Sequence, residues 1–161
     1  MEWMATALTG LPNTILGSLL TISAGILIWN KQLQWKYKHE QTVYLCTLIS
    51  KLEAEFGKIL NLAAVHQVNL TYPPIENNVY KIIDLCHELR ALSHSLRFIG
   101  KRHAADLAFE AYDLASSESQ NLALTLHVFS DNVEAVHEQI YSTCTTSKKG
   151  LMEKLSQLNK D

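Results

Sequence analysis

Cationic side chains are concentrated in one short stretch of this chain of 161 residues. All three arginines lie within thirteen positions, with lysine and histidine among them. Five of these side chains are spaced three or four residues apart, which places them on one face of a helix: His87, Arg90, His94, Arg97 and Lys101. Guanidinium groups bind phosphate oxygens through paired hydrogen bonds. We therefore predict a phosphate-binding surface made of six residues: Arg90, His94, Arg97, Lys101, Arg102 and His103.

The same side chains also fit a solvated helix face that binds no ligand. Asp84, Glu88 and Asp106 lie nearby in the sequence and offer ion-pair partners within the chain. In favour of a ligand site, Gly100 and the start of the following helix add backbone N–H groups that can donate hydrogen bonds to an anion. Both interpretations stay open, and they differ in whether the arginines are already paired.

Metal binding and catalysis have little support in the sequence. Cysteine and histidine occur in two groups without the spacing of a zinc site: Cys86, His87 and His94, and His127, His137 and Cys144. No GxSxG, P-loop, GxGxxG or paired-carboxylate pattern is present. We therefore expect no metal, no cofactor and no enzymatic activity. Three separated cysteines without a CxxC pair favour a reducing compartment.

Charge is distributed unevenly along the chain. Residues 1–30 contain one charged side chain, Glu2, whereas residues 31–161 contain all 14 basic and the other 15 acidic ones. The formal net charge of −2 excludes binding of duplex nucleic acid by bulk charge, so any anion site must be local. We divide the chain into a membrane anchor at 1–30, a connecting and bundle helix at 31–70, and the rest of a ligand-binding domain at 71–161.

The N-terminal segment from Trp3 to Asn30 has 28 residues without a formal charge. As a helix it would measure about 42 Å, compared with roughly 30 Å for the hydrocarbon core of a bilayer. With a regular helix from Asn13, it predicts a single transmembrane span in the inner (cytoplasmic) membrane. Lys31, Lys36 and Lys38 follow directly, which places the N-terminus outside and the remaining chain in the cytoplasm. A buried helix of a soluble protein is the alternative.

Small and hydroxyl side chains form one stripe on this predicted span: Thr14, Gly17, Ser18, Thr21 and Gly25. Such stripes let helix backbones approach closely in lipid, so we expect self-association, with a water pore as a more specific version. The alternative is that each hydroxyl bonds a carbonyl of its own helix.

The remaining chain predicts an all-α bundle. A four-three apolar spacing runs through one long helix: Leu45, Ile49, Leu52, Phe56, Ile59, Ala63, His66 and Leu70. Tyr72-Pro73-Pro74 ends it, and a second helix covers about 78–99, with Gly100 as its C′ residue. A third helix is predicted at about 101–115, a fourth at 122–140, and a short last one from Ser147.

This layout, an anchor followed by a cytoplasmic helical domain with a cationic patch, resembles the small membrane effectors of type III CRISPR systems. The resemblance implies a tetramer that binds cyclic tetra-adenylate and perturbs the membrane in antiviral defence. Adenine bases would need stacking partners, for which five aromatic residues are available: Tyr72, Tyr80, Phe98, Tyr112 and Tyr141.

Two other functions fit the same layout. One is a constitutive membrane-tethered adaptor that recruits a protein partner through its Leu45–Leu70 stripe. The other is a phage lysis regulator.

Overall fold

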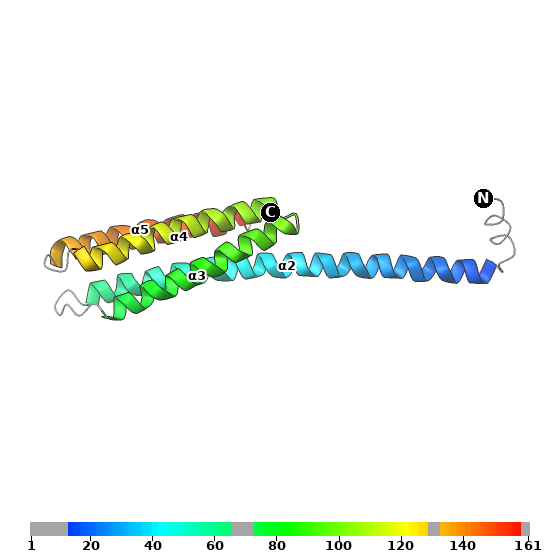
Figure 1. The fold of residues 1–161 in the computed structure, drawn as a ribbon, viewed down its shortest axis with the longest axis horizontal. Helices are drawn as coiled ribbons and strands as arrows, with labels where there is room; N and C mark the ends of the chain where they lie inside the picture. Colours follow the sequence, from blue (N-terminus) through cyan, green and yellow to red (C-terminus); the bar gives the residue numbers. More distant parts are fainter. Residues whose placement is uncertain (1–12, 66–72, 129–132, 159–161) are drawn as a thin grey trace. The chain divides into compact units, whose positions relative to one another are not determined.

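The computed structural model describes residues 13–65, 73–128 and 133–158, and its fold in these ranges is all-α, as predicted. These ranges contain four helices: α2 (Asn13–Val65), α3 (Pro73–Phe98), α4 (Arg102–Val128) and α5 (Val133–Leu158) (Figure 1). The chain divides into two compact units, and the boundary between His39 and Glu40 falls inside α2.

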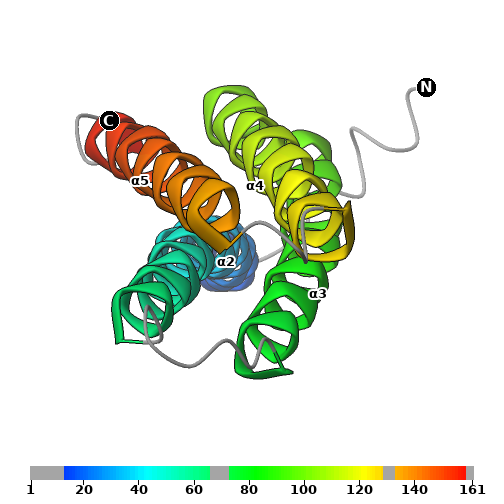
Figure 2. The ribbon, with the colours of Figure 1, turned by 90° about the vertical axis from the view of Figure 1, so that its left-hand side faces the viewer.

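The second unit, from Glu40 onward, is a four-helix bundle. Viewed along the helices, α2, α3, α4 and α5 follow one another around a common core (Figure 2). Each neighbouring pair of helices is joined by a hydrogen bond or ion pair between side chains: Tyr44–Glu88, Arg97–Asp106, Glu110–Lys154 and Lys148–Glu53. The order of the helices along the chain is therefore also their order around the bundle.

The core stripe predicted on α2 is confirmed where the structure describes it. Its members are all buried, from Leu45 to Ala63, whereas His66 and Leu70 lie outside the described residues. The predicted face of α3 is buried as well: Val79, Ile82, Cys86, Leu89, Ser93 and Leu96. From Leu45 to Ala63, the stripe that the adaptor hypothesis assigned to a protein partner is therefore part of the core.

Small residues let α4 approach its two neighbours more closely than the other helices approach one another. Its buried face carries five alanines: Ala104, Ala105, Ala108, Ala111 and Ala115. On α5, Gly150 faces Leu114 of α4 so closely that an added Cβ would lie 2.6 Å from Leu114 Cδ2. An alanine at position 150 would therefore require the end of the Leu114 side chain to move.

Buried hydroxyl groups of the bundle are satisfied within their own helices. Ser93 donates to the carbonyl of Arg90 at 2.7 Å, and Ser147 donates to that of Thr143 at 2.8 Å. Ser119 makes the same kind of bond to Ser116 at 2.9 Å. These bonds remove the desolvation penalty of the hydroxyls without any interhelical partner.

The predicted start of the second helix, at about residue 78, is wrong, because α3 already begins at Pro73. The predicted end of the first helix, at Leu70 to Tyr72, lies outside the described residues. Proline is tolerated in the first turn of a helix because its missing N–H has no partner there.

The predicted boundaries in the C-terminal half are also wrong. The gap expected after Ala115 does not exist, because α4 continues to Val128. The helix expected over 122–140 is divided between α4 and α5, and Ser147 lies inside α5. The sequence Ser-Asp-Asn just before Val133 contains residue types that favour helix N-caps, a signal that periodicity alone overlooked.

The described N-terminal half of α2 carries many exposed apolar side chains. Ten large ones are exposed: Leu19, Leu20, Ile22, Ile26, Leu27, Ile28, Trp29, Leu33, Trp35 and Tyr37. Among the described residues, however, no helix contains a stretch long and apolar enough to cross a membrane. Residues 3–12 of the predicted span lie outside the described ranges.

The small-residue stripe shows at least one of the local bonds that were its alternative explanation. Thr21 donates to the carbonyl of Gly17 at 2.8 Å, and Ser23, outside the stripe, donates to that of Leu20 at 2.9 Å. An alanine Cβ at Gly17 or Gly25 would meet nothing within 4 Å, so neither glycine is packed in this chain. The predicted self-association stays a prediction.

Candidate ligand-binding surface on α3 and α4

The turn between α3 and α4 positions the cationic residues, and Gly100 forms it as predicted. Its φ of +80° lies in the left-handed region that favours glycine. The Lys101 N–H donates to the Leu96 carbonyl at 2.9 Å, and the Gly100 N–H donates to the Arg97 carbonyl at 3.1 Å. This pair of bonds is a Schellman motif, which ends α3 and turns the chain directly into α4.

All six residues of the predicted surface are exposed: Arg90, His94, Arg97, Lys101, Arg102 and His103. Three are on α3, one is in the turn, and two begin α4. Periodicity predicted this arrangement for the α3 residues, because the exposed positions at three- and four-residue spacing form a stripe beside the buried face.

Arg97 has a partner within the chain. Its Nη2 lies 2.6 Å from Asp106 Oδ1, and more than half of each side chain is exposed. This is one of the internal pairs expected for a solvated face. Exposed ion pairs contribute about 0–1 kcal/mol to stability, so an anionic ligand can displace Asp106 at little cost.

Arg90 lies against an aromatic surface supplied by α4. Its guanidinium carbon is 5.7 Å from the ring centre of Tyr112, and the ring of Phe109 lies 5.9 Å from that of Tyr112. Phe109 is half exposed. Sequence reasoning included Tyr112 among the stacking candidates but missed Phe109, whose signal was its position three residues before Tyr112 on the same helix face.

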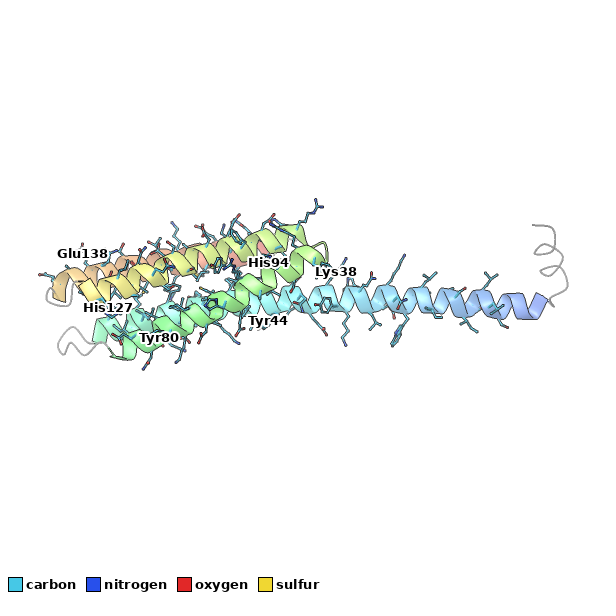
Figure 3. All side chains as sticks on the ribbon, viewed as in Figure 1. Lys38, Tyr44, Tyr80, His94, His127 and Glu138 are labelled. Carbon is cyan, nitrogen blue, oxygen red and sulfur yellow. The ribbon has the colours of Figure 1, made fainter. Side chains whose placement is uncertain are left out.

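The other suggested partners and aromatic residues lie elsewhere. Glu88 accepts a hydrogen bond from the Tyr44 hydroxyl at 2.7 Å, and this bond to a carboxylate raises the pKa of Tyr44. Tyr80 on α3 and Tyr141 on α5 are exposed, and Tyr72 lies outside the described residues. His94 and Tyr80 lie toward opposite ends of α3 (Figure 3).

The buried cysteines are held as neutral thiols. Burial raises the pKa of Cys86 and of Cys144 to about 12, so neither is a nucleophile at neutral pH. In the described ranges, no cluster of three or more His, Cys, Asp or Glu residues could hold a metal ion.

Comparison with known proteins gives no relative: no family model, no curated protein and no solved structure matches the chain.

Proposed function

We propose that this chain is a lipid-anchored helical effector whose bundle binds a phosphorylated nucleotide messenger. The α3–α4 surface around Arg90 and Arg97 is the binding site, and the ligand belongs to the cyclic oligoadenylate class, with cyclic tetra-adenylate as the first candidate. The observation that carries this proposal is the pairing of cationic and aromatic groups on one exposed face: Arg90, Arg97, Phe109 and Tyr112. Guanidinium groups bind phosphate, and aromatic rings stack on bases.

The continuity of α2 supports coupling between the site and the lipid segment. The exposed apolar residues from Leu19 onward and the buried residues from Leu45 to Ala63 belong to one helix without a break. If the bundle has two packings and the ligand binds one of them more tightly, ligand binding raises the population of that packing. Because α2 belongs to the bundle, its position changes with the packing. In this proposal the chain acts as a tetramer, and ligand binding opens a pore in the membrane or disrupts it. No catalytic group is needed.

Ligand binding is tested by titrating the full-length chain with cyclic tetra-adenylate, with AMP and with inorganic phosphate. A ligand specific for the folded state raises the melting temperature. We expect Arg90→Ala and Arg97→Ala to weaken binding and Asp106→Asn to strengthen it, because Asp106 competes with the ligand for Arg97. Lys81→Ala, on an exposed part of α3, is the matched control.

Two results contradict the binding site. Binding that is unchanged in both arginine variants removes Arg90 and Arg97 from it. If cyclic tetra-adenylate leaves the melting temperature of the folded, helical chain unchanged, the ligand is not this nucleotide.

Lipid anchoring is tested separately by flotation of the full-length chain with vesicles after alkaline washing. Leu19→Arg adds a charge that costs about 2.5–3.5 kcal/mol in the centre of a membrane helix, so it should reduce retention by lipid. Lys51→Arg, exposed on the bundle part of α2, should not. Native wild-type chain that stays in the aqueous fraction without detergent contradicts the anchor.

A further inference from the structure

The turn between α3 and α4 lies at the end of the bundle where the chain enters it from the N-terminal segment. The Tyr44–Glu88 hydrogen bond, 2.7 Å long, places α3 beside the first turns of the bundle part of α2. α2 and α3 run in opposite directions (Figure 1). From Glu88 to Phe98, α3 therefore advances about 15 Å toward the Glu40 end of the bundle.

One aromatic side chain stands out at this turn. Phe98, the last residue of α3, is 93% exposed, more than any other large hydrophobic side chain in the described ranges. Lys101 and Arg102, which follow within four residues, are exposed as well. A bare phenyl ring in water is unfavourable, and the bundle offers no apolar surface that covers it.

The charge around Phe98 has one sign. From His94 to Ala105 the sequence contains no acidic residue, and the first one after it, Asp106, pairs with Arg97. No ion pair is recorded for Lys101 or Arg102 within the part of the chain that the structure describes. An exposed phenyl ring next to two exposed cations is chemically complementary to a lipid surface, which has an apolar interior and can have anionic headgroups.

We propose that this corner, defined as Phe98, Lys101 and Arg102, binds anionic lipid headgroups of the bilayer that holds the N-terminal segment. The inference rests on the lipid anchor of the proposed function, and it gives these two cations a role different from that of Arg90. The ring of Phe98 enters the boundary between headgroups and acyl chains, and the two cations contact lipid phosphates. The corner lies at the end of the bundle at which Glu40 begins the bundle part of α2.

The test uses a fluorescent label whose emission rises in an apolar environment. Cys46, the half-buried thiol, is replaced by serine, and the label is attached to the full-length chain through Ser95→Cys, one turn before Phe98 on an exposed position. Tyr80→Cys is the matched control, since Tyr80 is 65% exposed near the other end of the same helix (Figure 3). The labelled chains are reconstituted in vesicles of phosphatidylcholine alone or mixed with phosphatidylglycerol.

We expect emission at position 95 to rise in the anionic vesicles relative to the neutral ones, with no change at position 80. The double variant Lys101→Glu, Arg102→Glu should abolish the rise, and Phe98→Ser should reduce it. Flotation of the same samples reports anchoring, and circular dichroism confirms that each variant is folded.

Four results overturn the inference. If the chain floats with the vesicles but position 95 behaves like position 80, the corner does not bind lipid and the anchor stands. A rise of the same size in neutral vesicles removes the requirement for anionic headgroups. A rise produced by inorganic phosphate without vesicles makes the corner a site for soluble anions. A chain that floats with neither vesicle refutes the anchor, and the inference with it.

Discussion

Replacing Gly150 with alanine tests the close contact of α4 and α5 against an opposing gain in helix propensity. Alanine is about 1 kcal/mol more favourable than glycine in a helix interior. At Gly150, however, the new Cβ would lie 2.6 Å from Leu114 Cδ2, with the Cγ and Cδ1 atoms of Leu114 at 3.8 and 3.9 Å. The contact distance of two carbon atoms is about 3.5–4.0 Å, so the end of the Leu114 side chain must move.

The expected magnitude follows from these two opposing effects. Moving Leu114 away from its preferred rotamer costs about 0.5–1.5 kcal/mol, which is similar to the gain in helix propensity. Gly150→Ala should therefore change the free energy of unfolding by less than about 0.5 kcal/mol. Gly57→Ala is the control, because its Cβ would lie 3.4 Å from Lys148 Nζ, an ordinary contact. It should stabilise the bundle by about 1 kcal/mol.

The assay is urea denaturation followed by far-ultraviolet circular dichroism, with all variants in the same buffer and detergent. A double-mutant cycle with Leu114→Ala isolates the contact, since the truncated side chain no longer reaches position 150. In that background Gly150→Ala should recover the full gain of about 1 kcal/mol. The reasoning is refuted if Gly150→Ala stabilises as much as Gly57→Ala while Leu114 is present, because α4 and α5 are then farther apart than described.

Three further predictions concern the core, the turn and the thiols. Phe56→Ala should lower the free energy of unfolding by about 3–5 kcal/mol in the same assay, since the ring is fully buried; a loss below about 1 kcal/mol would place it outside the core. Gly100→Ala should cost about 1–2 kcal/mol because of its φ of +80°, and an unchanged urea midpoint would contradict this backbone conformation. In the folded chain the pKa of Cys86 and of Cys144 is raised to about 12, so these thiols lose their protons at lower pH in the unfolded chain. The contribution of the two neutral thiols to stability is therefore complete below about pH 8.5 and decreases as the pH rises toward 12. Alkylation of the native chain should accordingly modify Cys46 first, and equal rates at all three thiols would show that the other two are not buried.

The sequence determined the fold class and which faces of the helices are buried. Leu45, Phe56, Ile82 and Leu89 could be placed in the core because a helix repeats every 3.6 residues, and a buried stripe must follow that period. Gly100 could be identified as the end of a helix because few other residues adopt its backbone conformation at low cost. Both signals are local, so no knowledge of the packing was needed.

Helix ends were less well determined, for a physical reason. The spacing from Leu122 to Ile140 keeps its phase although the two residues belong to different helices. Periodicity records which side of a helix is apolar, and it contains no information on where one helix stops when the next one begins in the same phase. The alanines of α4 were missed as core residues because alanine is common on both buried and exposed faces.

The partners of the cationic side chains were decided by the tertiary structure alone. Among several acidic neighbours of Arg97, the pairing with Asp106 depends on how the turn at Gly100 sets α4 against α3. The contact between Arg90 and Tyr112 joins residues on different helices, and its geometry follows from the packing of α3 on α4. A sequence can place charges on a helix face through its period, but which groups meet across two helices depends on their relative rotation and shift, and these are set by the packing of the whole core.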